Sequence, residues 1–128
     1  MLEVGAGCGL PGLVAARVGA ESVILTDGSD VVMRLLKRQR EAFVAKHSVS
    51  QGAEACGEVL AHKLEWGSSS ELEGLKKLTG SNGETLKPSV LIGADVVCWP
   101  ACIEPLLDTT KALFLDLADP FEGVLYIG

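Results

Sequence analysis

Short apolar runs alternate along the chain with longer segments in which apolar residues recur every three or four positions. The short runs are bounded by Gly, Ser or Asp, which is typical of buried strands, and the longer segments have helical spacing. The predicted strands are Met1–Val4, Ser22–Thr26, Gly57–His62, Ser89–Ala94 and Gly123–Ile127. The predicted helices are Leu10–Val18, a helix from Ser29 or Asp30 to about Lys46, Glu71–Leu78, and a helix after Pro100 that includes Phe114. This alternation predicts an α/β fold, with a mostly parallel sheet and helices on both faces.

Two of the predicted helices have an apolar stripe that we expect to pack on the sheet. In the second helix the stripe is Val32, Leu35, Leu36 and Phe43. In the last helix the stripe is Ile103, Leu106, Leu107, Leu113 and Phe114. By contrast, residues 67–88 are polar and contain several glycines, so this segment is predicted to be a surface insertion that carries only one short helix.

The chain of 128 residues is long enough for one domain at most. Its first predicted strand has only four residues before a glycine turn, and Gly128 falls where a strand should pass into a loop. A parallel strand usually has about five residues. We therefore expect the chain to be part of a larger domain that continues on both sides.

Composition excludes several classes of function. The formal net charge of −6 argues against nucleic acid as the main partner, because phosphate binding needs a basic face. No apolar run approaches the ~18–20 residues of a membrane span, and no signal peptide is predicted. Cys98 and Cys102 are four residues apart without a nearby histidine, which predicts no metal site. The four cysteines are typical of intracellular thiols.

The segment after the first strand contains alternating glycines at Gly5, Gly7 and Gly9, followed by Pro11 at the start of a helical pattern. A strand, a glycine turn and a helix N-terminus form the unit that binds nucleotide-like cofactors in α/β proteins. Glu3 ends the strand and is expected to face the cofactor crevice. A carboxylate at this position would repel a pyrophosphate, but it suits a cationic ammonium such as the amino acid end of S-adenosylmethionine (SAM).

Acidic residues follow each of the first four predicted strands. They are Glu3, Asp27, Glu65 and Asp95, and the third strand adds Trp66. Open parallel sheets bind ligands at the carboxyl ends of their strands, so these side chains are expected to lie together. Asp27 lies about twenty residues after the glycine loop, where a carboxylate accepts hydrogen bonds from ribose hydroxyls. Asp27-Gly28 is also a good turn dipeptide. Trp66 can stack on adenine or serve as an ordinary core residue.

Four segments in this order resemble the motifs of a known family. They are Glu3–Gly12, Leu25–Asp27, Leu64–Gly67 and Gly93–Val97. They resemble the family 16 SAM-dependent methyltransferases, which are seven-β-strand protein-lysine methyltransferases of the methyltransferase-like 21 type. Two departures are Glu65, where the family usually has Asp, and Cys98, where it usually has Tyr. Trp99 is the candidate replacement for that aromatic wall of the lysine channel.

The resemblance implies a Rossmann-like class I methyltransferase fold, the cofactor SAM and a protein lysine as the substrate. Together with the strand-end pattern, it gives a predicted cofactor-binding set of Glu3, Gly5, Ala6, Gly7, Gly9, Asp27, Glu65, Trp66 and Ala94. It places Asp95 beside the reacting methyl group as the catalytic residue, with no metal. It implies a cytoplasmic protein, with the nucleus as a second compartment. The family would add a hairpin beside the last strand, and without it we expect a catalytically poor, marginally stable domain.

Two other functions remain open from the sequence. The spacing of Gly7, Gly9 and Gly12 also satisfies the dinucleotide fingerprint, so an NAD(P)-dependent oxidoreductase is one alternative. A non-catalytic interaction protein that keeps the methyltransferase fold is the other, and the cysteine at position 98 favours it. Titration with SAM and with NADH distinguishes a methyltransferase from an oxidoreductase. A methylation assay with labelled SAM distinguishes a methyltransferase from a non-catalytic protein.

Overall fold

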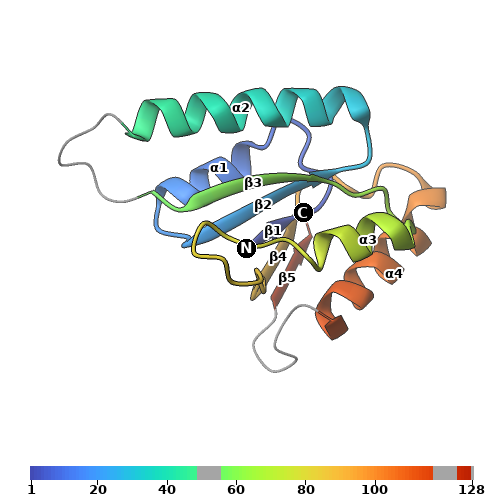
Figure 1. Ribbon diagram of the computed structural model, residues 1–128. Helices are drawn as coiled ribbons and strands as arrows, with labels where there is room; N and C mark the ends of the chain where they lie inside the picture. Colours follow the sequence, from blue (N-terminus) through green and yellow to red (C-terminus); the bar gives the residue numbers. More distant parts are fainter. Residues whose placement is uncertain (49–55, 117–123, 128) are drawn as a thin grey trace.

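The computed structural model describes residues 1–48, 56–116 and 124–127, and these form an α/β fold around one parallel sheet (Figure 1). The sheet has five strands in the order β3-β2-β1-β4-β5, and every pair of neighbouring strands is parallel. The strands are β1 (Leu2–Glu3), β2 (Ser22–Asp27), β3 (Glu58–Lys63), β4 (Val90–Gly93) and β5 (Val124–Ile127). The predicted strands are thus confirmed within one residue at each end. Gly123, the predicted start of the last strand, lies outside the described residues.

Helices cover both faces of the sheet, as the sequence predicts. In Figure 1, α1 (Leu10–Arg17) and α2 (Asp30–Ser48) lie on one face. On the other face lie α3 (Ser69–Leu75) and α4 (Pro100–Asp116). Successive residues of a strand point to opposite faces. Leu2 therefore packs into the cluster on the α3 and α4 side, whereas Glu3 faces α1.

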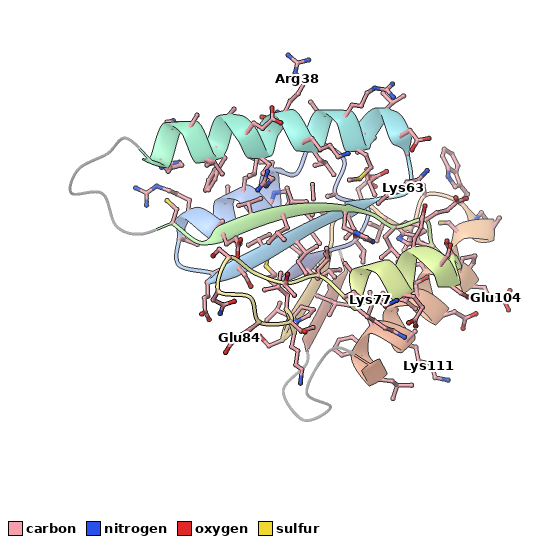
Figure 2. All side chains as sticks on the ribbon, in the orientation of Figure 1. Arg38, Lys63, Lys77, Glu84, Glu104 and Lys111 are labelled. Carbon is pink, nitrogen blue, oxygen red and sulfur yellow. The ribbon has the colours of Figure 1, made fainter. Side chains whose placement is uncertain are left out.

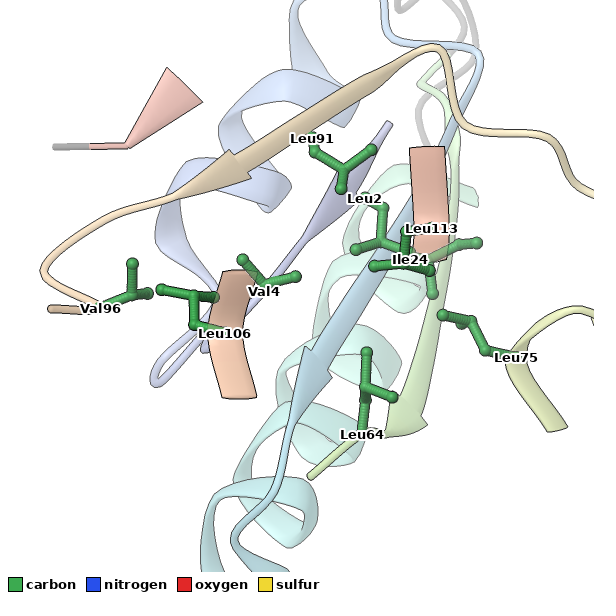
Figure 3. Packing of buried hydrophobic residues seen from close by; sticks show 9 residues of the cluster. All are labelled: Leu2, Val4, Ile24, Leu64, Leu75, Leu91, Val96, Leu106 and Leu113. Carbon is green, nitrogen blue, oxygen red and sulfur yellow. The ribbon is translucent and has the colours of Figure 1, made fainter. Parts of the chain in front are cut away.

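Two hydrophobic clusters stabilise the sheet, one on each face. The cluster on the α4 side contains Leu2, Val4, Ile24, Leu64, Leu75, Leu91, Val96, Leu106 and Leu113, all of which are nearly or fully buried (Figure 3). The cluster under α1 and α2 contains Ala6, Ala16, Val23, Leu25, Met33, Leu36 and Val59. Val4 and Ala6 follow β1, Leu64 follows β3 and Val96 lies just after β4. Because these residues are packed in the core, the loops at the carboxyl ends of these strands are held in place.

The predicted stripes of α2 and α4 are only partly right. Leu35, Ile103 and Leu107 are exposed, although each was expected to be buried. In α4 the buried face instead includes Thr109 and Thr110. The Thr109 hydroxyl accepts a hydrogen bond from the Gly67 amide at 2.9 Å, and the Thr110 hydroxyl donates to the Leu107 carbonyl at 3.0 Å. Because these bonds satisfy both hydroxyls, the helix can turn its threonines inward and its apolar flank outward.

The segment 67–88 differs from a plain surface insertion. It begins with α3, which starts two residues before the predicted helix because the Ser68 hydroxyl caps it by accepting from the Glu71 amide at 3.4 Å. Leu75 of α3 is buried in the core, and Leu78 and Leu86 pack against that cluster. With Leu72, four positions of this polar segment contact the core, and Leu72, Leu75 and Leu78 recur every three residues within the predicted helix Glu71–Leu78.

Candidate functional site

The glycine loop after β1 is anchored on both sides. Gly5, Gly7 and Gly9 have φ angles of 61°, 55° and 75°, a left-handed conformation that only glycine adopts readily. Within this region the Val4 amide donates to the Ile92 carbonyl of β4 at 2.9 Å, and the Ala6 amide donates to the Thr26 carbonyl of β2 at 2.8 Å. The start of the loop is therefore held by backbone hydrogen bonds to β4 on one side and to β2 on the other.

Glu3 lies beneath this loop rather than facing a crevice, which corrects the placement predicted from the sequence. Its side chain is buried, and its carboxylate accepts a hydrogen bond from the Gly12 amide in α1 at 2.9 Å. The first amides of a helix lack partners within the helix, so a carboxylate there satisfies one of them. Burial raises the pKa of Glu3 to about 7, and the Gly12 amide partly opposes this rise.

The raised pKa of Glu3 predicts a specific dependence of stability on pH. The folded state holds the proton up to about pH 7, whereas the ordinary value is 4.5, so stability is lost as the pH rises between these values. The expected loss is about 3 kcal/mol of unfolding free energy. Glu3→Gln cannot ionise, so its stability relative to wild type should rise by that amount between pH 4 and pH 8. Urea denaturation at both pH values measures it.

An exposed acid provides the control for this experiment. Glu41 lies on the exposed side of α2, and Glu41→Gln should leave the pH dependence of the wild type unchanged. If the unfolding free energy of Glu3→Gln fell with pH as steeply as that of wild type, a group other than Glu3 would cause the pH dependence.

Asp27 joins the glycine loop to the start of α2. One carboxylate oxygen accepts from the Gly7 amide at 3.2 Å, and the other accepts from the Ser29 amide at 2.9 Å. The second bond is the turn-forming contact expected of an Asp-Gly pair. Asp27 thus has a structural role, but it also lines both depressions described next.

Two adjoining depressions lie at the carboxyl ends of the strands. The β3-side lobe, of about 240 Å³, is lined by Gly5, Asp27, Gly28, Ser29, Leu64, Glu65 and Trp66. The β4-side lobe, of about 200 Å³, is lined by Gly5, Asp27, Trp66, Asp95, Val96, Cys98, Trp99 and Cys102. Gly5, Asp27 and Trp66 belong to both. The two lobes therefore form one divided site at the position where open parallel sheets bind ligands.

Gly5 permits the close packing of Trp66 and Val96 at the boundary between the two lobes. A Cβ atom at this residue would lie 2.9 Å from Val96 Cγ1 and 3.1 Å from Trp66 Cζ2. The Trp66 indole thus packs directly on the loop backbone and against the core, while part of its surface remains open to the lobes. Trp66 therefore has the core role that the sequence left open, and its stacking on adenine stays a prediction.

The charged side chains that line the two lobes are all carboxylates. They are Asp27, Glu65 and Asp95, and no lysine or arginine is among the lining residues. Glu65 and Asp95 are exposed, and Asp95 has a φ of 56°, which aspartate tolerates better than most residues. Lys63, at the end of β3, bonds to Asp30 at 2.8 Å and lies 3.8 Å from Glu71. The site therefore favours a cationic or hydroxyl-rich ligand over an anionic one.

The structure gathers about half of the predicted site residues at the lobes. Gly5, Asp27, Glu65, Trp66 and Asp95 line them directly. The other predicted residues do not line either lobe. Gly7 donates to Asp27, and Glu3 lies beneath the loop. Ala6 and Gly9 hold the loop through backbone hydrogen bonds, and Ala94 precedes Asp95.

Several lining residues were missed as site residues. Ser29 could have been found from its position two residues after Asp27, the spacing of an Asx turn. Cys102 lies in the first turn of α4, four residues after Cys98, which precedes the helix. Leu64 and Val96 could have been found because they lie in the motif segments Leu64–Gly67 and Gly93–Val97, and Gly28 because it belongs to the Asp27-Gly28 turn.

A larger depression, of about 500 Å³, lies at the opposite edge of the sheet. It is lined by the first residues of β2 and β3, Ser22 and Glu58, together with part of the segment 67–88. It is therefore remote from the glycine loop and is not the candidate site. Among the described residues no cluster suited to a metal ion was found, and none of their helices is both long and apolar enough to cross a membrane.

Comparison with protein families identifies this arrangement. The family model described as lysine methyltransferase matches residues 1–116. The chain belongs to the lysine methyltransferase family. This confirms the resemblance based on the four sequence motifs.

The fold of this lysine methyltransferase family member is also similar to a solved methylase. The crystal structure of ribosomal protein L11 methylase from Lactobacillus delbrueckii subsp. bulgaricus matches with a TM-score of 0.53 and 19% sequence identity. The match covers 98% of this chain and 50% of that protein, so the chain spans about half of its length. The similarity supports the Rossmann-like methyltransferase fold.

Proposed function

We propose that this protein is a SAM-dependent methyltransferase that transfers methyl groups to a lysine of a protein substrate. The observation that carries the cofactor assignment is the charge of the site: three carboxylates and no basic residue line the two lobes. SAM brings a sulfonium and an ammonium, both cationic, together with ribose hydroxyls. The lysine acceptor is supported by the family to which the chain belongs.

The amides of the glycine loop support SAM over a dinucleotide. In dinucleotide-binding proteins, loop and helix amides bind the pyrophosphate. In this chain the Gly7 amide donates to the Asp27 carboxylate and the Gly12 amide donates to the Glu3 carboxylate. Pro11 has no amide hydrogen. A pyrophosphate would have to displace the protein's own carboxylates, so an NAD(P) oxidoreductase is disfavoured.

Each lobe suits one part of SAM. In the β3-side lobe, Asp27 accepts hydrogen bonds from the ribose hydroxyls, Trp66 contacts the adenine and Glu65 lies at the edge. In the β4-side lobe, Gly5 and Asp95 border the amino acid portion, and Ala94 contributes as the residue that precedes Asp95. Glu3, Ala6, Gly7 and Gly9 contribute by holding the loop in shape. SAM, when bound, supplies an activated methyl group on its sulfonium.

The β4-side lobe also suits the acceptor amine. A lysine amine attacks only after it has lost its proton, and an apolar wall that removes water from the amine lowers its pKa. Val96 and Trp99 provide apolar surface, whereas the Asp95 carboxylate can accept a hydrogen bond from the amine and orient it. Asp95 is thus proposed to act on the acceptor more than on SAM.

Binding and turnover assays test the function directly. Isothermal titration calorimetry should show binding of SAM and no binding of NADH. Tritiated SAM should label one or more proteins of a cell lysate, and mass spectrometry should place the methyl group on lysine. SAM binding without any transfer would favour the non-catalytic alternative, and NADH binding would favour the oxidoreductase.

Asp27→Ala should weaken SAM binding at least tenfold. The variant loses charge-assisted hydrogen bonds to the ribose, for which tenfold corresponds to about 1.4 kcal/mol. Calorimetry measures the change. Asp27→Asn keeps the size of the side chain but only one acceptor oxygen, so it can accept from the Gly7 amide or from the Ser29 amide but not from both. Asp30→Ala, which removes an exposed acid at the start of α2, is the matched control and should bind SAM normally. Unchanged affinity in a folded Asp27→Ala variant would place the ribose elsewhere.

A further inference from the structure

We propose that Val97 and Trp99, here called the rim patch, form the docking surface for the methyl-acceptor protein at the mouth of the β4-side lobe. The inference rests on the proposed function and names the surface that recognises the protein partner. The occupant is a segment of that protein in which an apolar side chain and basic residues accompany the target lysine.

Both residues of the rim patch are apolar and yet largely exposed to solvent. Trp99 is 69% exposed and Val97 is 53% exposed, whereas Val96, the residue before Val97, is 3% exposed and packs in the core. Trp99 also lines the β4-side lobe beside Asp95. A large apolar surface that continues into a polar pocket is typical of a recognition site rather than of an isolated exposed residue.

The backbone beneath the rim patch is held in place. The Trp99 carbonyl accepts from the Cys102 amide at 3.1 Å and from the Cys102 thiol at 2.9 Å. The Cys98 thiol donates to the Asp95 carbonyl at 3.1 Å. The indole is therefore presented by an ordered backbone, which lowers the entropy lost on binding. Tryptophan is among the side chains that contribute most to binding energy at protein interfaces.

Charge around the rim patch selects the partner. Residues 88–107 contain the acids Asp95 and Glu104 and no lysine or arginine. Figure 2 labels Glu104 on the outer side of the structure near the start of α4, with Lys111 further along the helix. An acidic rim attracts a basic segment and guides its encounter. In such a segment the target lysine enters the β4-side lobe, and its basic neighbours lie against the acidic rim.

The test compares Trp99→Ala with wild type, using tritiated SAM and a cell lysate as the acceptor source. At low lysate concentration, labelling of the wild-type acceptor band should fall at least tenfold, while the SAM dissociation constant stays within twofold. Raising the lysate concentration should restore part of the rate, because the defect lies in acceptor binding. Trp99→Phe keeps an aromatic anchor and should retain most of the rate.

Leu115→Ala is the matched control, because Leu115 is 68% exposed on α4 but does not line the lobe. It should label the acceptor like wild type. Equal labelling by Trp99→Ala and wild type would overturn the docking surface but leave the methyltransferase proposal intact. No labelling by wild type would overturn both. A Trp99-dependent dimer in size-exclusion chromatography would make a second copy of the chain the occupant and overturn the proposal.

Discussion

Asp95→Asn should lower the rate of methyl transfer by about a hundredfold, while the affinity for SAM changes by less than about threefold. Removing one well-placed electrostatic contact to a reacting group typically costs 10²–10³ in turnover. Asparagine has the size of aspartate and tolerates the left-handed backbone conformation at this position, where φ is 56°. The fold should therefore be kept. Single-turnover assays with labelled SAM, together with calorimetry, measure the two effects separately.

Asp108→Asn is the matched control for this variant. Asp108 is an exposed acid on α4 that lines a different, small depression beside α3. Its replacement should leave turnover within about twofold of wild type. Wild-type turnover in Asp95→Asn would remove this carboxylate from the mechanism, and a parallel loss of SAM affinity would assign it to cofactor binding instead.

Gly12→Ala should destabilise the protein by about 1–3 kcal/mol and weaken SAM binding along with stability. A Cβ atom at residue 12 would lie 2.3 Å from Leu25 Cδ2 and 2.6 Å from the Glu3 carboxylate. α1 would have to move away from the sheet and take the end of the glycine loop with it. The helix propensity of alanine offsets at most about 1 kcal/mol. Thermal and urea denaturation measure the loss.

A double-mutant cycle identifies the cause of this loss. Leu25→Ala removes the side chain that the new methyl group would meet, although it also creates a cavity. If steric conflict is the cause, the double variant should be more stable than the sum of the two single effects implies. Strict additivity would instead point to the contact with the Glu3 carboxylate, to the unfolded chain or to the helix alone.

The sequence predicts the strands well because each is a short, largely apolar run with Gly, Ser or an acidic residue at one end or at both. It also predicts which residues meet at the site, since Asp27, Glu65 and Asp95 lie at the carboxyl ends of β2, β3 and β4, which share one edge of the parallel sheet. The family motifs around the same positions are confirmed by the family match over residues 1–116. Both successes depend on local patterns and on the geometry of parallel sheets.

The predictions that failed depend on contacts between distant residues. The direction of the Glu3 side chain follows from its bond to the Gly12 amide, which no local pattern specifies. The apolar stripe of α4 was misjudged because Thr109 and Thr110 are buried, and the partner of Thr109 is Gly67, more than forty residues away. Polar residues that find buried partners look like surface residues in a sequence.

The shared position of Gly5 has a consequence for how two ligands would influence each other. This residue lines both lobes and follows a central strand of only two residues. A ligand that shifts or steadies Gly5 in one lobe therefore changes a wall of the other. Such coupling is reciprocal: if the first ligand improves the affinity for the second by some factor, the second improves the affinity for the first by the same factor. Cofactor and acceptor affinities are then properties of the pair, and neither is fixed by its own lobe alone.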